Sequence, residues 1–196
     1  KKGARSAEFE VAIQWLTDCG LIYKINRINK PSIPLKAYID FSAYKLFVVD
    51  VGLLGALADV DAESIIEGNS IFVEFKGAIT EQFVLQQLLS LTDLRLFYYS
   101  SPNSSGEIDF ITQIENLIVP IEVKASENLQ AKSLKAFHQK WQNDFSVRTS
   151  LADFRHDGWL TNIPLYGIHI GEVQFCPHFF QKPYIFYDFG RFFFLQ

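Results

Sequence analysis

Acidic residues and a lysine stand in two adjoining strand-like stretches, at a spacing that could support metal-ion or acid–base chemistry. The first stretch, 106–110, contains Asp109, and the second stretch, 120–124, contains Glu122. Residues two apart on a strand share a face and lie roughly 6.6 Å apart along it, so Glu122 and Lys124 point the same way. The sequence thus predicts a carboxylate beside an ammonium on one strand and a second carboxylate on its neighbour.

The two stretches extend into the runs 107–114 and 117–124, which only residues 115–116 separate. A two-residue loop is typical of a β-hairpin, although its tight turns need positive φ, for which glutamate is a poor choice. Hairpin pairing would set Asp109 directly opposite Glu122, and opposed residues lie about 4.5–5.5 Å apart. Carboxylates that close repel unless a proton or cation lies between them, and a divalent ion with oxygen ligands would resolve the repulsion.

The same pattern has a second interpretation. An acid and a lysine two positions apart are common on solvated strand faces, where they are surface decoration. The acids here are embedded in strongly apolar strands, where an unpaired carboxylate is costly. Pro120 argues against a central hairpin, because proline lacks a backbone donor and belongs at sheet edges or bulges.

A third acid, Glu81, lies in a stretch of helical periodicity. Apolar residues recur through 72–91 at the spacing of an amphipathic helix. Glu81 shares its stripe with Gly77 and Ala78 before it and Leu85 after it, so we expect it to face packed surface. The alternatives are a residue at the rim of that surface or a helix partner for a nearby lysine.

The order of these elements resembles the PD-(D/E)XK nuclease-like fold: a helix with an inward glutamate, two strands of which the second carries an aspartate, a strand with Glu-x-Lys, and a further helix. The chain is similar in particular to the C-terminal domain of unknown function (domain of unknown function 4143) of bacterial and archaeal AAA-type ATP-binding proteins. The resemblance runs from the start to about residue 168. The stretches that carry it are 15–22, 45–54, 75–81, 107–110, 121–125, 132–134 and 163–166.

The resemblance implies a mixed α/β fold with a restriction-endonuclease-like core, a mixed sheet flanked by helices. It implies catalytic roles for Glu81, Asp109, Glu122 and Lys124. Asp109, Glu122 and the backbone carbonyl of Val123 would hold Mg²⁺ or Mn²⁺, which polarises a phosphate and lowers the pKa of a bound water. Lys124 would orient or help deprotonate that water and steady the developing charge, while Glu81 would complete an outer shell or hold a second ion.

Two functions therefore stand as hypotheses. The first is a Mg²⁺-dependent nuclease-like domain that hydrolyses phosphodiester bonds in DNA under control of an upstream ATPase domain of the same polypeptide. The second is a catalytically inactive module that binds DNA or protein, or regulates that ATPase, since the same fold hosts inactive members. The chain lacks methionine and a phosphate-binding Gly-x-x-x-x-Gly-Lys-Ser/Thr loop, so we expect the ATPase to lie in a piece ahead of Lys1.

We expect three segments along the chain. For residues 1–60 we expect a partial winged-helix-like module, which would contact DNA or serve as a rigid connector. Residues 70–170 predict the nuclease-like domain. Residues 171–196 hold eight phenylalanines without a clean period, and would be a fold extension, a homo-oligomer contact or the product of an altered reading frame. In the first segment we expect a helix at 6–19 with an apolar stripe and strands at 21–25 and 35–39. We expect Asp50 to be a cap or turn residue. In the second segment we expect further strands at 94–100 and 145–150 and a helix at 128–142.

Composition bounds the classes of protein. The chain of 196 residues is long enough for one sizeable core, and its two cysteines are too few for a disulfide framework. It has no apolar run long enough for a membrane span, so we expect a cytoplasmic protein. The net charge of −4 lacks the overall basic balance that is typical of nucleic-acid binders.

Overall fold

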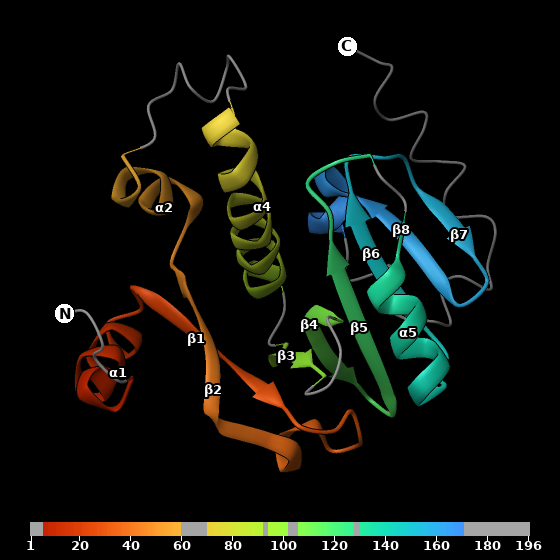
Figure 1. Cartoon of the computed structure of the whole chain (residues 1–196), viewed down its shortest axis with the longest axis horizontal. Coiled ribbons are helices and arrows are strands. Elements are labelled where there is room, and N and C mark those ends of the chain that lie inside the picture. The colour runs from red at the N-terminus through yellow and green to blue at the C-terminus, as the bar shows by residue number, and fades with distance from the viewer. Residues whose placement is uncertain (1–5, 60–69, 92–93, 102–105, 128–129, 171–196) are drawn as a thin grey trace.

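The computed structural model describes residues 6–59, 70–91, 94–101, 106–127 and 130–170, and it has a mixed α/β architecture, as expected (Figure 1). The strands of these residues form one mixed eight-stranded sheet in the order β2-β1-β3-β4-β5-β6-β8-β7. The strands are β1 (Ile22–Ile28), β2 (Ile39–Val48), β3 (Leu96–Ser100), β4 (Glu107–Ile114), β5 (Leu117–Val123), β6 (Ser146–Ser150), β7 (Arg155–Asp157) and β8 (Leu160–Pro164). The α-helices are α1 (Glu10–Asp18), α2 (Val51–Leu57), α4 (Ser70–Leu91) and α5 (Lys132–Trp141).

Helices α4 and α5 cover opposite faces of this sheet (Figure 1). Leu85 of α4 packs in one buried cluster with Phe110, and Leu134 of α5 packs in another with Ile111. Because neighbouring residues of a strand point to opposite faces, the two clusters lie on either side of β4. Strand β4 thus lies at the centre of a three-layer arrangement.

The strands and helices predicted for the core are confirmed within a few residues. The predicted strands 107–114 and 117–124 coincide with β4 and β5, and the helix predicted at 128–142 begins later, at Lys132. Strands β7 and β8 were not predicted. Strand β8 is fully buried yet carries Thr161 and Asn162, so its sequence lacks the apolar run that signals a buried strand.

Pro120 lies inside the sheet and not at its edge. It is paired with Ile111 of β4, and its strand β5 lies between β4 and β6. Pairing of β5 with β6 begins at Ile121, one residue later, so the missing proline donor falls before the second ladder starts. The proline therefore costs no ladder bond between β5 and β6.

The N-terminal strands join the same sheet. Strand β1 pairs with β2 on one side and, through Arg27 and Ile28, with β3 on the other. The strand predicted at 35–39 is wrong, because Leu35–Tyr38 forms a 3-10 helix whose first residue is buried and donates its backbone N–H to Gln113 Oε1 (3.0 Å). The N-cap predicted at Asp50 is confirmed, since its side chain accepts from the backbone N–H of Leu53 (2.8 Å).

Helix α1 differs from its prediction. A 3-10 helix (Ser6–Phe9) precedes it, and no residue of α1 itself is buried. Phe9 and Leu16, expected on a packed apolar stripe, are exposed. The phenylalanine-rich segment 171–196 and residues 60–69 lie outside the described residues. Among the helices that are described, none is long and apolar enough to cross a bilayer.

Candidate functional site

The β4–β5 hairpin places the two predicted carboxylates on neighbouring strands. Its pairing runs from Ile114 and Leu117 to Phe110 and Ile121, which confirms the register expected from a two-residue loop. Glu115 takes the positive φ (52°) that the turn needs despite its side chain. Continued by one position, this register sets residue 109 opposite residue 122.

A β-bulge redirects Asp109. Strand β4 spans 108–111 where β3 spans only 97–99, so β4 carries one extra residue around Asp109. Bulges bend a strand and re-aim a side chain, often beside functional sites. The Asp109 carboxylate turns to β5, where its Oδ2 accepts a hydrogen bond from the backbone N–H of Val123 (2.7 Å).

The environment of Asp109 disfavours its ionised form. Burial raises the pKa of this carboxyl to about 7, and the negative charges of Glu81 and Glu122 act in the same direction. The hydrogen bond from Val123 and the positive charge of Lys45 lower the pKa but do not offset the burial. Asp109 thus gains or loses its proton near neutral pH, and a nearby cation would favour the ionised form.

Glu122 is the more deeply buried partner. Its side chain is only 3% exposed, and its Oε1 forms an ion pair with Lys124 Nζ (2.8 Å). Its other oxygen, Oε2, is buried with no hydrogen-bond partner. Arg148 of β6 stands at the paired position across from Glu122, and the charge of Glu122 opposes the burial that lowers the pKa of Arg148. We call Asp109 and Glu122 together the Asp109–Glu122 pair.

A second group of charges adjoins this pair. Lys45 of β2 contacts Glu107 Oε1 and lies 3.5 Å from Glu81 Oε2. Burial lowers the pKa of Lys45, but the hydrogen bond to Glu107 and the charges of Glu81, Glu107 and Asp109 together raise it above its usual range. Lys45 therefore remains charged at neutral pH. We call Lys45 with Glu81 and Glu107 the Lys45 bridge.

The predicted residues thus separate into two sets. Asp109 bonds to Val123 and Glu122 pairs with Lys124, while Glu81 turns to Lys45 and acts on Asp109 through its charge. Reasoning from the sequence missed the roles of Lys45, Glu107 and Arg148. Lys45 carries a weak signal, a lone charge next to an apolar run, but nothing in the sequence indicates a partner 36 positions away.

An open groove of about 460 Å³ reaches the Lys45 bridge. Strand β2, α2 and α4 line it, and Lys45 and Glu81 are its charged lining residues. Gly77 widens its wall, because a Cβ there would meet nothing within 4 Å. The groove is large enough for part of a nucleotide-sized ligand.

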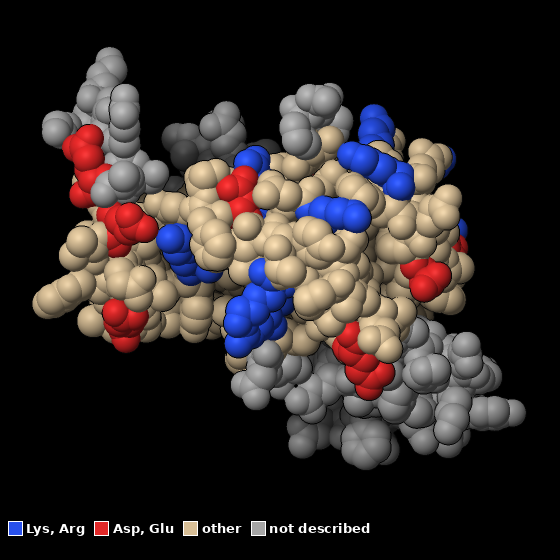
Figure 2. All heavy atoms as spheres, turned by 90° about the horizontal axis from the view of Figure 1, so that it is seen from below, with Lys and Arg blue, Asp and Glu red and all other residues tan. Residues whose placement is uncertain are grey.

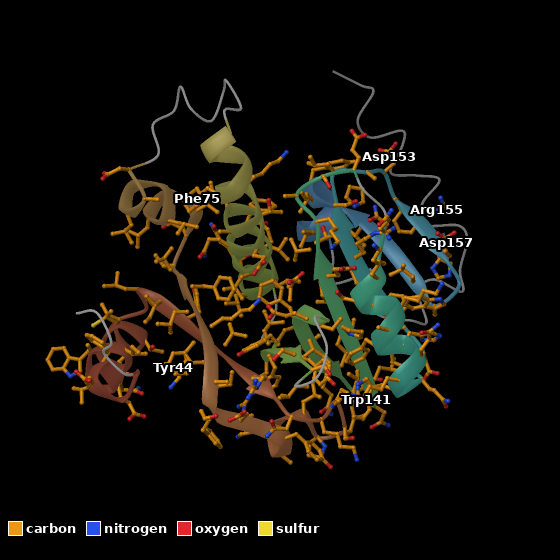
Figure 3. All side chains as sticks on the ribbon, viewed as in Figure 1. Tyr44, Phe75, Trp141, Asp153, Arg155 and Asp157 are labelled. Atoms are coloured by element: carbon orange, nitrogen blue, oxygen red, sulfur yellow. The ribbon has the colours of Figure 1, made fainter. Side chains whose placement is uncertain are left out.

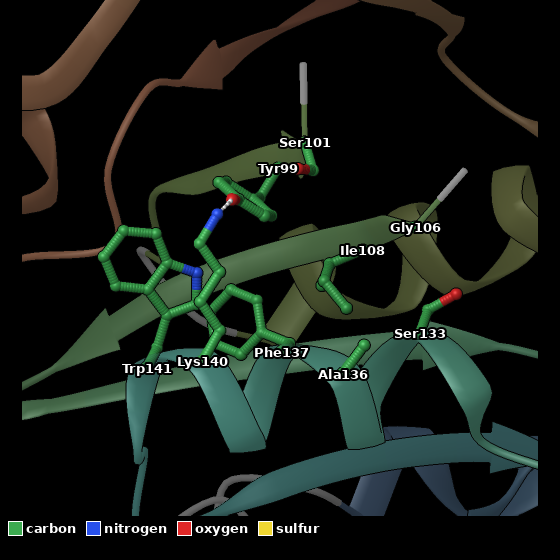
Figure 4. Close-up of a pocket in the computed structure, with 9 residues that line it drawn as sticks. All are labelled: Tyr99, Ser101, Gly106, Ile108, Ser133, Ala136, Phe137, Lys140 and Trp141. Atoms are coloured by element: carbon green, nitrogen blue, oxygen red, sulfur yellow. Dashed lines mark hydrogen bonds between the residues drawn. The ribbon is translucent and has the colours of Figure 1, made fainter. Parts of the chain in front are cut away.

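A smaller pocket lies between α5 and strands β3 and β4 (Figure 4). Its volume is about 50 Å³, and Lys140 Nζ donates to the Tyr99 hydroxyl (3.3 Å) within it. Lys140 also lies over the ring of Trp141, at 5.0 Å from the centroid. The pocket has room for little more than water and no carboxylate lines it.

The Asp109–Glu122 pair suits a hard divalent cation. The buried Glu122 Oε2 has no hydrogen-bond partner, and the raised pKa of Asp109 shows that its ionised form is disfavoured, so a cation near either oxygen would be stabilised. The described part of the chain contains no group of three or more His, Cys, Asp or Glu side chains placed to hold a metal. An ion here would therefore need backbone and water oxygens besides the pair, as Mg²⁺ commonly does.

Comparison with known families divides the chain into two matched segments. Residues 76–166, slightly less than half of the chain, match a domain of unknown function (DUF4143). Residues 1–64 match a second domain of unknown function (DUF8612). No curated protein and no solved structure matches the chain. The Asp109–Glu122 pair, Glu81 and Glu107 belong to the first of these matches, and Lys45 belongs to the second.

Proposed function

We propose that this chain carries a Mg²⁺-dependent, nuclease-like domain with a restriction-endonuclease-like core, which hydrolyses phosphodiester bonds in DNA. We further propose that it acts as the C-terminal part of an AAA-type ATP-binding protein, under control of an upstream ATPase domain. The observation that carries the proposal is the Asp109–Glu122 pair: a half-buried Asp109 with a raised pKa on β4, and on the neighbouring strand β5 a buried Glu122 with one unpartnered oxygen and an ion pair to Lys124.

Each residue has a defined part in this reaction. Asp109 and Glu122, with a backbone oxygen of Val123, would hold the metal ion, which polarises the phosphate and lowers the pKa of its bound water. The hydrogen bond from the Val123 N–H keeps the Asp109 carboxylate oriented. Lys124 is 34% exposed, so its remaining N–H donors can reach the attacking water and the developing phosphate charge while one stays on Glu122.

Cleavage of DNA in Mg²⁺ and in EDTA tests the proposal. Single-stranded, duplex and branched substrates should be offered to the whole chain, because nothing described selects among these forms. We expect Mg²⁺-dependent cleavage that Lys124→Ala lowers at least about 100-fold. Lys135→Ala is the matched control, since Lys135 lies exposed on α5. If no substrate is cleaved, or if Lys124→Ala leaves the cleavage rate unchanged, the proposed nuclease activity is rejected.

The alternative is a catalytically inactive nuclease-like module that binds DNA or regulates the ATPase. Arg148 and Lys124 together offset the charge of Glu122, as in a structural ion network. Lys and Arg side chains also form separate groups on the face in Figure 2, with acidic side chains among them. Weak, salt-insensitive DNA binding without cleavage would favour this function, whereas steeply salt-dependent binding would favour a DNA-processing domain.

A further inference from the structure

The groove between β2, α2 and α4 has mostly apolar walls and one pair of opposite charges. Its volume of about 460 Å³ lies within the range of sites that hold small organic molecules. Leu46, Leu54 and Ala78 contribute apolar wall, and Lys45 and Glu81 are the charged lining residues in the part of the chain that the structure describes. A ligand that fits this groove would have an apolar body and a polar edge directed at this pair.

The charged pair is held in place before any ligand binds. Gln82, buried on α4 next to Glu81, donates to the carbonyl of Val48 on β2 (2.7 Å) and accepts from its N–H (3.1 Å). The Lys45 ammonium lies 5.3 Å from the centroid of the Tyr98 ring, which favours a cation over its face. The two walls and the two charges are therefore pre-organised, which lowers the cost of binding.

Glu81 has unused capacity to accept hydrogen bonds at the wall of this groove. Among the described residues its carboxylate takes one hydrogen bond, from Lys45 at 3.5 Å, and its side chain is 31% exposed. A carboxylate offers about four acceptor sites, and an ammonium has three donors, of which Glu107 and Glu81 take two from Lys45. The groove thus presents two carboxylate oxygens beside an ammonium donor.

This arrangement of charges selects among ligands. Glu81 would repel a phosphate, and Lys45, 3.5 Å from the same carboxylate, would repel a cation, so a neutral polar edge is favoured. Guanine has such an edge, because its N1–H and N2–H are neighbouring donors and its O6 acceptor adjoins them. The other three DNA bases lack two neighbouring donors on the corresponding edge, so they cannot bond to both oxygens of one carboxylate in this way.

We propose that this groove binds a guanine base, which donates its N1–H and N2–H to the Glu81 carboxylate and accepts at O6 from Lys45. Leu46 and Leu54 would contact the flat ring. The same edge of guanine is paired in duplex DNA, so the base must be unpaired in a strand or belong to a free nucleotide. This recognition goes beyond the proposed nuclease, because it needs neither a metal ion nor cleavage.

Binding of guanosine and inosine 5′-monophosphates to the whole chain in EDTA, measured by calorimetry, tests this inference. Inosine lacks only the N2 amino group, so we expect it to bind about tenfold more weakly. Glu81→Gln should weaken the binding of guanosine monophosphate at least about tenfold and should reduce its advantage over inosine monophosphate. Lys45→Met should weaken both nucleotides alike, because both bases carry O6.

Gly77 allows a variant that blocks the groove and spares the fold. A Cβ at Gly77 would meet nothing within 4 Å, and leucine is a better helix former than glycine. Gly77→Leu should therefore fold, fill part of the groove and lower the affinity for guanosine monophosphate at least about tenfold. Gly55→Leu on α2 is the matched control, because a Cβ there also meets nothing within 4 Å and Gly55 is not among the described lining residues.

A thymidine oligonucleotide with one central guanine or inosine separates the two sources of the base. Guanine-dependent binding of the single strand, without binding of its duplex or of free nucleotide, assigns an unpaired guanine in DNA; binding of the free nucleotide alone assigns a guanine nucleotide. The proposal is overturned by equal affinity for guanine and inosine, by unchanged affinity in Glu81→Gln or Gly77→Leu, or by no binding of any probe. Thermal melting monitored by circular dichroism confirms that each variant folds. Because every measurement is made in EDTA, failure of the proposed nuclease leaves these results unaffected.

Discussion

The carboxylates of this region fall into two halves, the Lys45 bridge and the Asp109–Glu122 pair, whose charges are balanced differently. In the Lys45 bridge, partly exposed glutamates share one ammonium, and water can solvate what the lysine does not. In the Asp109–Glu122 pair, Glu122 is buried and one of its oxygens has no hydrogen-bond partner, while the half-buried Asp109 has a pKa raised to about 7. The bridge thus has one ammonium for two glutamates, whereas in the pair Glu122 is matched by Lys124 and Arg148 and Asp109 has a raised pKa.

Because of this difference, we expect the two halves to respond differently to metal ions and to pH. An ion pair at a partly exposed position contributes little stability, and its own cation disfavours a metal ion. Buried, unsatisfied carboxylates cost stability, and that cost is recovered when a cation binds. The pair should therefore respond strongly to metal and pH, and the bridge weakly to both.

The largest expected effect is that of Asp109→Asn. It removes one of two charged ligands, so cleavage should fall about 1000-fold and Mn²⁺ binding should be lost within the tested range. Kinetic assays and Mn²⁺ titration would measure the two quantities. Asp144→Asn, on an exposed loop, is the matched control. Unchanged Mn²⁺ affinity in Asp109→Asn would remove the pair from the metal site.

The pH dependence of stability isolates Asp109 without any substrate. Its pKa is about 7 in the folded chain against 3.8 ordinarily, so the folded state binds the proton more tightly. The resulting stabilisation is complete below about pH 4 and is lost as the pH rises through about 7. We expect a loss of about 2–4 kcal/mol in the free energy of unfolding, measured by urea denaturation in EDTA.

Two comparisons complete this measurement. Asp109→Asn has no proton to lose there, so its curve should lack that fall and exceed the wild type above pH 7. Mn²⁺ should reduce the fall in the wild type, because the ion binds the ionised carboxylate. A fall of equal size in Asp109→Asn would assign the effect to another group.

The sequence predicted the Asp109–Glu122 pair better than the Lys45 bridge, because the residues of the pair are close together in the sequence and those of the bridge are far apart. The hairpin is local: a two-residue loop and alternation suffice to predict its register, which the structure keeps from Ile114 and Leu117 to Phe110 and Ile121. The bulge that turns Asp109 to Val123 is not encoded in the alternation of β4 and depends on how β3 pairs with it. Lys45 meets Glu81 through the packing of β2 on α4, which no local pattern predicts.

The edges of the sheet show the same limit. Strand β7 is exposed throughout, and its Arg155 and Asp157 form an ion pair at 2.7 Å, so the strand has no apolar alternation to recognise (Figure 3). Helix α1 has the apolar periodicity of an amphipathic helix, but none of its residues is buried. Local sequence thus predicted the centre of the fold and missed elements whose state depends on distant neighbours.

Glu122→Gln should have an effect of intermediate size, and we expect it on the stability of the fold. The variant keeps the side-chain shape but removes the charge opposite buried Arg148 and the ion pair to Lys124. We expect a loss of about 1–3 kcal/mol in the free energy of unfolding at pH 7, measured by urea denaturation in EDTA. Glu127→Gln, exposed just after β5, should change it by less than about 0.5 kcal/mol. A more stable Glu122→Gln would mean that its unpartnered oxygen outweighs its ion pairs.

Glu107→Gln should have the smallest effect and most directly tests the contrast between the halves. Glu107 is 44% exposed, and Lys45 keeps Glu81 as a partner when its charge is removed. We expect less than about 1 kcal/mol of lost stability and less than about a threefold change in Mn²⁺ affinity, measured by urea denaturation and calorimetry. If Glu107→Gln weakens Mn²⁺ binding as severely as Asp109→Asn, the metal site extends across the Lys45 bridge, and the cluster is one site whose two halves cannot be separated.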